Sequence, residues 1–360
     1  MKLKYLIMLP LCFSGMAHSE LRYSGFLSLN LGKVLSTDTV YDPVFTGEEV
    51  ERKFLADYPN ASVYDKNLSI EPETLAAIQF DYDILSDLSA TVQLVSRGAS
   101  DFTVEPEWAY LTYEFSDNFS IQAGKKRLPL FYYSDFFDLG YAYVWMRPPS
   151  DTYTWHILNY KGVNLTYTDE WGDWSVNANI YGGERKENIN KFFTDVFFRE
   201  PTPEFWDKIR GAVFSTSYEF LEIRASYMQY QTGLFPDDDI ETVNTETKKF
   251  YGLAINMDFD DWFILSEYNE IHYSSSEYKT MMGTIAKRIG DDYTVYFAYS
   301  SFNTTPETEF AEKHSTHSVG ARWDFNDNAA FKMQLDSVKD DRYSVLGGSE
   351  AITFGIDYIF

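Results

Sequence analysis

From Glu20 to the last residue, the chain repeats short segments in which apolar and polar side chains alternate. In the first of them Leu21, Tyr23, Leu27 and Leu29 fall on one face, opposite mostly polar residues. A period of two residues is that of a β-strand with one apolar and one polar face. The segments are roughly ten residues long, which is what a tilted strand needs to cross a bilayer. This pattern restricts the chain to an all-β architecture.

About sixteen such segments can be counted, an even number, with short polar turns on one side and long loops on the other. This asymmetry and the strand length favour a transmembrane antiparallel β-barrel with both termini at the short-turn end. A soluble β-sandwich or barrel also alternates, but it has no reason to separate turns from loops in this way. The hairpin at Glu219-Phe220 lacks turn residues, and the face of segment 278–289 is unclear. The expected strands lie within 21–31, 76–84, 88–97, 109–115, 119–123, 163–167, 174–181, 212–218, 221–227, 251–259, 262–268, 278–289, 293–299, 317–325, 329–335 and 352–360.

The composition agrees with a thin apolar surface. The chain has 28 Tyr and 29 Phe, yet its mean hydropathy is negative. Abundant aromatic residues without overall hydrophobicity are typical of a barrel whose lipid-facing belt is bordered by aromatic girdles. After the first nineteen residues, no stretch is long and apolar enough to be a membrane-spanning helix.

The first nineteen residues have the features of a secretory signal peptide. Lys2 and Lys4 precede a short apolar core, and Ala17-His18-Ser19 provides small residues for cleavage, so that Glu20 would begin a single mature barrel domain, 20–360. Cys12 is the only cysteine, and the bulky Leu11 before it argues against lipidation. The mature chain therefore has no disulfide framework and no cysteine-based metal site.

The chain is strongly acidic. Its formal charge is −25, and removal of the two leader lysines brings it to about −27. Such a chain repels nucleic acid, so no DNA or RNA partner is expected.

The stretch from Gly124 to Trp155 interrupts the pattern. It shows neither strand alternation nor a helical stripe, and Pro148-Pro149 excludes regular structure near its end. It is also too aromatic for a disordered linker. Long ordered loops are usually functional, and we expect residues 128–155 to fold into the barrel mouth and narrow it.

With these features the chain resembles the Gram-negative porin superfamily over essentially its whole mature length. The terminal run, with Phe354, Ile356, Tyr358 and Phe360, is similar to the aromatic-ended last strand that the outer-membrane assembly machinery reads. The long loop after the fifth strand corresponds to the family's constriction loop. The resemblance implies sixteen strands, a trimer, and a location in the outer membrane. The chain lacks the Pro-Glu-Phe-Gly-Gly run of enterobacterial members and is more similar to porin-like proteins of marine gamma-proteobacteria.

The polar face of a barrel this size lines a water-filled lumen. Our hypothesis is that acids of the central loop face wall bases across the narrowest section and produce a transverse field that selects ions. For any single residue, solvation or simple pairing is the commoner role. The loop residues are Asp135, Asp138, Arg147 and Asp151; the wall bases are Arg22, Arg97, Lys126, Arg224, Arg322 and Lys332; the wall acids are Asp81, Asp83, Glu114, Asp258, Asp324 and Asp336.

Other acids are expected in external loops, among them Glu48, Glu49, Glu51, Asp57 and the run 237–239. They either bind divalent cations shared with lipopolysaccharide or keep the loops soluble.

The sequence thus predicts an outer-membrane porin for passive diffusion of small hydrophilic solutes and ions, without cofactor or metal. A saccharide- or anion-specific channel stays open as an alternative, because loop Tyr and Trp rings stack on sugars as readily as they pack. A barrel hydrolase is a weaker one: neither Gly-x-Ser-x-Gly nor His-Glu-x-x-His occurs, and His314 and His317 form a lone pair. A structural barrel filled by its loops is the third. The remaining histidines of the mature chain are His156 and His272.

Overall fold

The computed structural model describes residues 20–42, 47–198, 200–234, 246–306, 312–340 and 346–360. The predicted leader and the acidic run 237–239 lie outside these residues.

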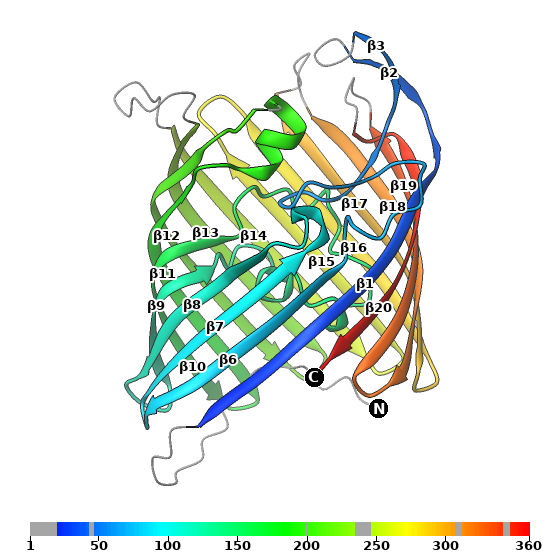
Figure 1. Ribbon diagram of the computed structural model, residues 1–360. Coiled ribbons are helices and arrows are strands. Elements are labelled where there is room, and N and C mark those ends of the chain that lie inside the picture. The colour runs from blue at the N-terminus through cyan, green and yellow to red at the C-terminus, as the bar shows by residue number, and fades with distance from the viewer. Residues whose placement is uncertain (1–19, 43–46, 199, 235–245, 307–311, 341–345) are drawn as a thin grey trace.

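Sixteen antiparallel strands form one closed barrel, as predicted (Figure 1). No helix in the described ranges is long and apolar enough to cross a membrane. The barrel strands are β1 (Leu21–Thr37), β6 (Leu75–Leu85), β7 (Leu88–Arg97), β8 (Val104–Glu114), β9 (Phe119–Arg127), β10 (Asn159–Trp171), β11 (Trp174–Glu187), β12 (Glu204–Tyr218), β13 (Leu221–Leu234), β14 (Glu246–Phe259), β15 (Trp262–His272), β16 (Glu277–Ile289), β17 (Tyr293–Thr305), β18 (Lys313–Asn326), β19 (Ala329–Asp340) and β20 (Ser349–Ile359).

The barrel closes where the first strand meets the last. β1 pairs with β20 from Phe26↔Ile359 to Thr37↔Ser349, and with β6 along its other edge. Beyond the ladder, Gly25 and Phe360 exchange two backbone hydrogen bonds of 3.0 Å. Leu21 and Phe360 therefore lie at the same end, the end of the short turns (Figure 1).

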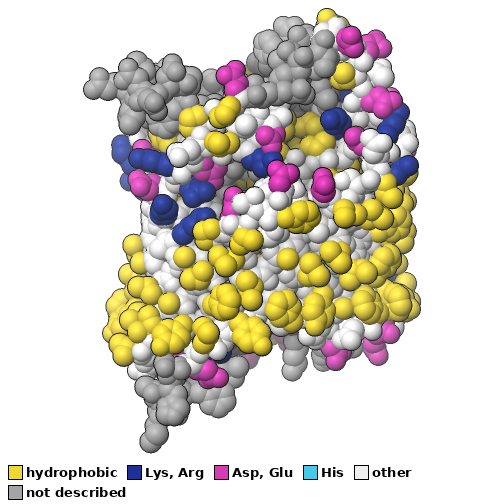
Figure 2. Space-filling view, in the orientation of Figure 1, with side chains coloured by type: hydrophobic (Ala, Val, Ile, Leu, Met, Phe, Trp, Pro, Cys, Tyr) yellow, Lys and Arg dark blue, Asp and Glu magenta, His cyan; other side chains and the backbone are white. Residues whose placement is uncertain are grey.

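Side chains alternate across the wall as the sequence pattern requires. On β1, Ser28 and Asn30 point inward and are 4% and 5% exposed, whereas Leu29 between them is 51% exposed. Outward apolar side chains form a belt that is densest toward the short-turn end (Figure 2). A soluble protein does not leave so large a contiguous apolar surface in water, so the belt is a lipid-facing surface.

Both segments that were uncertain in the sequence are ordinary barrel strands. The link between β12 and β13 is a tight turn in which Glu219 takes a positive φ of 46°, and Tyr218 pairs with Leu221. In β16 the inward face carries Met282 and Ala286, both buried. Its two faces are both apolar because the inner one packs against a loop inside the barrel.

The polar, acidic composition of residues 36–70 predicts an external loop, but the β1–β6 connection folds partly into the barrel. It contains two short hairpins, β2–β3 and β4–β5, and the second folds into the barrel: Phe54 and Tyr64 are buried against Val34 and Ala351 of the wall. Asp57 accordingly is not an external residue, while Glu48, Glu49 and Glu51 are exposed. The hairpin strands are β2 (Thr39–Asp42), β3 (Glu48–Glu51), β4 (Phe54–Asp57) and β5 (Ser62–Tyr64).

The segment between β9 and β10, residues 128–158, lies inside the barrel, as predicted for 128–155 (Figure 1). We call it the constriction loop. It follows the fifth barrel strand and contains two short 3₁₀ turns, η2 (Ser134–Phe136) and η3 (Gly140–Ala142). Gly124–Arg127, at the start of the aromatic stretch, belong instead to β9. Two further short helical segments, which the sequence did not indicate, are η1 (Gly98–Ser100) and η4 (Phe193–Phe198).

Candidate functional site

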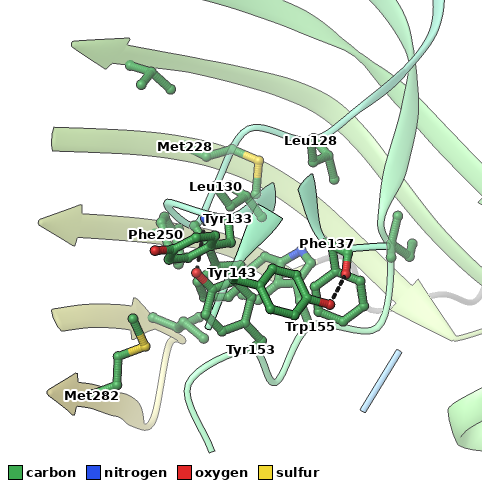
Figure 3. Close-up of a cluster of buried hydrophobic side chains, with 14 of the residues drawn as sticks. Leu128, Leu130, Tyr133, Phe137, Tyr143, Tyr153, Trp155, Met228, Phe250 and Met282 are labelled. Atoms are coloured by element: carbon green, nitrogen blue, oxygen red, sulfur yellow. Dashed lines mark hydrogen bonds between the residues drawn. The ribbon is translucent and has the colours of Figure 1, made fainter. Parts of the chain in front are cut away.

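The constriction loop has an apolar body that packs against one side of the inner wall (Figure 3). Phe131 lies 4.7 Å from Tyr153, and Trp155 lies 4.9 Å from Trp206 of β12, ring centroid to centroid. Each fully buried large apolar side chain contributes about 1.5–3 kcal/mol, which explains how a loop without regular structure stays ordered. Inward apolar residues of β10–β17 complete the cluster; among them are Met228, Phe250, Met282 and Tyr296.

The same packing removes most loop aromatic rings from contact with solutes. Trp145 is 1% exposed and Trp155 4%, and Tyr133, Tyr143 and Tyr153 are buried. The indole N–H of Trp145 donates to Thr284 of β16 over 3.0 Å. These five rings are packing residues, so they offer no face on which a sugar could stack.

Cationic side chains of the wall hold the loop backbone. The Lys332 ammonium, 1% exposed, donates to the carbonyls of Gly140 and Trp145 and lies 2.9 Å from the Asp357 carboxylate. A Cβ at Gly140 would meet Asp357 at 2.2 Å, so only glycine lets the loop approach this closely.

Two wall arginines act in the same way. Arg322 donates to the carbonyls of Tyr141 and Tyr143 over 2.8 and 2.9 Å and also binds Asp324. Arg224 donates to the Pro129 carbonyl over 2.8 Å. Because a guanidinium presents several donors in one plane, it can hold unpaired loop carbonyls that no strand satisfies.

Asp138 is bound at the centre of a buried group of four charges. The Arg97 guanidinium, from β7, lies 2.6 Å from the Asp138 carboxylate and 2.8 Å from the carboxylate of Glu107 in β8. Arg127 contacts both carboxylates. All four side chains are less than one tenth exposed. The wall arginines therefore touch the loop acid directly, where the hypothesis placed them across a gap.

Arg147 joins the loop to three other elements. Its guanidinium binds Glu73, before β6, and Asp336 of β19 over 2.8 Å, and donates to Thr353 of β20. Burial acts against its charge, but the carboxylates of Glu73 and Asp336 outweigh this and raise the pKa of Arg147.

Asp151 is held by β17 and β18. It accepts a hydrogen bond from Ser300 over 2.7 Å and lies 2.5 Å from Nδ1 of His314. Burial acts to raise the pKa of Asp151, but the charge and hydrogen bond of His314 lower it overall. His314 therefore helps to anchor the loop to the wall through its contact with Asp151.

Asp135 and Lys126 have a different environment. Asp135, in η2, is exposed inside the barrel, and its charge acts on Lys126 of β9 and on the inward tyrosines Tyr160 and Tyr181. Lys126 lies 5.0 Å above the ring of Tyr110 and bonds Gln122. Among the described residues, Asp135 is the one loop acid of the predicted set that makes no ion pair.

The predicted charges therefore separate into three groups. Asp138, Asp151, Arg147, Arg97, Arg224, Arg322 and Lys332 are anchors of the loop. Asp135 is exposed, and Lys126 contacts Gln122 and Tyr110 of the wall. Arg22 bonds Asp83 over 3.0 Å near the short-turn end, away from the loop. Their part in ion selectivity stays a prediction.

A polar cavity of about 40 Å³ separates the constriction loop from the β4–β5 hairpin. Asp57 and Asn60 of the hairpin, Asn30 of β1, and Arg97 and Arg147 line it. Its volume fits roughly two or three water molecules. Burial raises the pKa of Asp57 to about 6, against the hydrogen bonds that Asn60 donates to it. The hairpin is thus a second inward element that covers this side of the loop.

Sequence reasoning missed several of the anchoring groups. Arg127 stands at a strand end, Glu73 lies in a connection, and Glu107 sits at the register shift of the β7–β8 ladder, so simple alternation does not identify them as inward residues. Glu267 accepts hydrogen bonds from the Tyr132 backbone and the Tyr153 hydroxyl, although nothing in the sequence separates it from other strand acids.

The four histidines that the structure describes lie apart from one another. His314 points inward to Asp151, whereas the outward His317 lies beside Tyr299, so the pair occupies opposite faces of β18. His156 stacks on Phe192, and His272 bonds Glu270. Within the described ranges, no group of three or more His, Cys, Asp or Glu residues is arranged to hold a metal ion.

Solved outer-membrane barrels match this architecture along almost the whole chain. The outer membrane channel DcaP of Acinetobacter baumannii has a TM-score of 0.62 at 11% sequence identity, covering 97% of this chain and 99% of DcaP. The anion-selective porin from Comamonas acidovorans has a TM-score of 0.60 at 11% identity, covering 95% of this chain and 100% of that one. The trimer form of OmpT, an outer membrane protein of Vibrio cholerae, has a TM-score of 0.58 at 11% identity, covering 96% and 100%.

No family model matches the sequence, and no curated protein matches it. At these identities the structural likeness shows the fold. The chain has the fold of the outer-membrane porins, a sixteen-stranded antiparallel barrel with a loop folded inside.

Proposed function

We propose that this protein is a porin that lets small hydrophilic solutes and ions diffuse passively across the outer membrane, and that it catalyses no reaction. The observation that carries the proposal is a long loop fixed by many anchors inside a closed barrel with a lipid-facing belt. A loop held this firmly sets a constant width for the passage. The long loops then face the cell exterior, and the leader 1–19 directs export.

The path that we propose runs between η2 and the inner wall of β8–β11. On the opposite side the apolar cluster and the β4–β5 hairpin fill the interior. Asp135 is exposed on the loop side, and Lys126 and Tyr110 lie on the wall. Two opposite charges across a narrow aqueous gap orient dipolar solutes and act differently on cations and anions.

The test is reconstitution in a planar bilayer under a potassium chloride gradient. Stepwise conductance is expected. Asp135→Asn should shift the permeability ratio toward chloride and Lys126→Gln toward potassium, each by about twofold, which corresponds to ~0.4 kcal/mol. Asp117→Asn, in the exposed β8–β9 turn, removes the same charge from outside the lumen and should leave the ratio unchanged.

The absence of conductance steps in an assembled barrel would contradict the proposal and would favour a barrel closed by its loops. Hydrolytic release of a fatty acid or sugar by the purified barrel would favour an enzyme. Equal ratios for Asp135→Asn and Asp117→Asn would remove Asp135 from the path.

We also propose that three copies assemble, as in the trimer form of OmpT. Sedimentation of the detergent-solubilised protein tests this, and a monomer would contradict it.

A further inference from the structure

An uncharged polar surface lines the inner wall of β9–β12 in the half of the barrel nearest the short turns. Every inward position of 120–122 in β9, 164–168 in β10, 175–179 in β11 and 215–217 in β12 is Ser, Thr, Asn or Gln. We call this surface the amide wall. Its side chains can donate and accept hydrogen bonds without attracting ions.

The charged part of the inner wall begins at the very next strand. In the β12–β13 ladder, Ser217 pairs with Glu222 and Ser215 with Arg224. Further round, Arg288 of β16 lies 2.6 Å from Asp258 of β14. In a chain of formal charge −25, four adjacent strands with only neutral groups at this depth are a distinct surface and not the general lining.

The side chains of the amide wall hold one another in place. Asn179 of β11 donates to the Asn164 amide oxygen over 2.5 Å and to the Thr166 hydroxyl over 3.1 Å. Asn177 donates to the Thr168 hydroxyl over 2.9 Å. Thr166, Asn177 and Asn179 are only half-buried, so they can also be reached from the lumen. The wall therefore presents ordered hydrogen-bonding groups to a solute.

Two aromatic side chains of β8 border the amide wall. Gln122 of the wall donates to Thr112 of β8 over 3.3 Å, and Tyr110 and Trp108 are the next inward positions along that strand. The indole N–H of Trp108 donates to Gln79 over 3.2 Å, and its ring centroid lies 6.5 Å from that of Tyr110. Both rings are half-buried, whereas the five loop rings are buried. They therefore offer apolar surface beside the hydrogen-bonding groups.

We propose that the amide wall and the Trp108–Tyr110 pair form a binding track for uncharged oligosaccharides. A sugar ring has an apolar C–H face that packs on aromatic rings, and a rim of hydroxyl groups that pair with amide and hydroxyl side chains. A neutral wall makes these bonds without the cost of desolvating a charge. Residues 164–168 alone extend about 13 Å along β10, a length that favours a chain of sugars over a single ring. The inference rests on the proposed function and names a solute class for it.

The test records single-channel currents in a planar bilayer with maltohexaose on both sides. Polyethylene glycol of the same hydrodynamic size is the comparison solute, because its ether oxygens accept hydrogen bonds along a chain that donates none. Maltohexaose should interrupt the current in resolved events, and polyethylene glycol should lower the current without them. Thr166→Val/Asn177→Leu/Asn179→Leu keeps the side-chain volumes and should shorten the events by roughly tenfold or more, because three hydrogen-bonding groups are lost. Trp108→Leu should shorten them severalfold, because it removes the ring surface.

Gln229→Leu/Gln231→Leu is the matched control, because it removes two amide groups from the outward face of β13. Its events should last as long as those of the parent. Conductance in potassium chloride should be the same in all of these proteins, since no substitution changes a charge. A failure of the proposed function would abolish that conductance, whereas a failure of this inference would leave it intact. Asn177→Leu alone carries the test if the triple variant does not assemble.

Events of equal duration in the parent and the triple variant would overturn the inference, as would events of the same kind with polyethylene glycol. Longer events with an acidic oligosaccharide, or with an uncharged hexapeptide, would overturn the assignment to neutral sugars. Unchanged events in Trp108→Leu would contradict the part given to the aromatic pair.

Discussion

At the scale of single residues, the interior is dominated by charged side chains that bind the constriction loop to the barrel wall. Arg147 and Asp336 are 189 positions apart in the chain, and Arg97 and Asp138 are 41 apart. Alternation identified Arg97, Arg224, Arg322, Lys332 and Asp336 as inward residues. It could not show which of them meet, because partners are chosen by closure of the barrel and by the path of the loop.

The Arg147 anchor gives the first prediction. Arg147→Met keeps the volume but leaves Glu73 and Asp336 buried without a cation, and breaking a buried pair in this way costs about 3–5 kcal/mol. Backbone amides of the constriction loop should exchange with deuterium faster, and open-channel current noise should increase. Arg22→Gln breaks an exposed pair worth about 0–1 kcal/mol and should change neither measurement. Loop exchange in Arg147→Met as slow as in the parent would show that the apolar cluster alone holds the loop.

Asp57 gives a pH prediction. Its pKa in the folded protein is about 6, above the value of about 3.9 of an unfolded chain, so the folded hairpin favours the protonated carboxyl. The β4–β5 hairpin should therefore be less stable above pH 6 and gain stability as the pH falls through 6 toward 4. Hydrogen exchange of residues 54–64 is the measurement, compared with that of Asp57→Asn at each pH.

Asp57→Asn is neutral at every pH and keeps the shape of the side chain. The parent hairpin should exchange faster than the variant at pH 7.5, and the ratio of the two rates should fall by roughly tenfold at pH 5 and approach one only near pH 4. A constant ratio between the two proteins over this range would mean that Asp57 does not control the hairpin.

At the scale of the elements, the strands could be predicted and the loops only partly. Lipid on one side and water on the other impose opposite demands on successive residues, and this is visible in any ten-residue segment. In β16 the rule fails, because Met282 and Ala286 face protein where the pattern expects water. The β4–β5 hairpin is too short for any periodicity, and burial of Phe54 and Tyr64, which the sequence does not announce, helps to fix its place.

The contact between β17 and β18 gives an element-scale prediction. A Cβ at Gly320 would meet the Tyr296 hydroxyl oxygen at 2.2 Å and ring carbon Cζ at 2.3 Å. The Tyr296 hydroxyl donates to Gln334, which also accepts from the Met146 backbone. Gly320→Val should displace the ring, weaken this attachment of the loop and cost about 1–3 kcal/mol. Gly283→Val, whose added atoms enter open space, is the control. The unfolding temperature, read on heat-modifiable gels, should fall for Gly320→Val and not for Gly283→Val. Equal falls would indicate that replacing either strand glycine destabilises the barrel, whatever its contacts.

At the scale of the whole molecule, the seam between β1 and β20 decides whether a cylinder exists. Phe360 contributes two backbone bonds to Gly25, and its ring lies over that glycine while remaining 50% exposed. Ile356 and Tyr358 point outward in the same row, and the sequence resemblance predicts that these residues form an assembly signal.

Phe360→Ala separates the structural role of Phe360 at the seam from its predicted role as an assembly signal. It keeps the backbone bonds, so the refolded barrel should unfold within a few degrees of the parent, as expected for a loss of about 1 kcal/mol in a large domain. If the ring is read during assembly, the amount of variant barrel in the outer membrane of growing cells should fall much further. Parallel losses in both measurements would make Phe360 a purely structural residue.

Because the two ends of the chain are neighbours at this seam, no strand of the barrel has to come first in the sequence. A gene that joins residue 360 to residue 20 through a short linker and opens the chain at the turn between β12 and β13 preserves every inter-strand ladder. Such a circular permutant should refold in detergent with parent-like conductance, yet display a different strand at its carboxyl end. Cells that still insert it would prove that their machinery recognises the finished ring; cells that discard it would prove that it reads the tail.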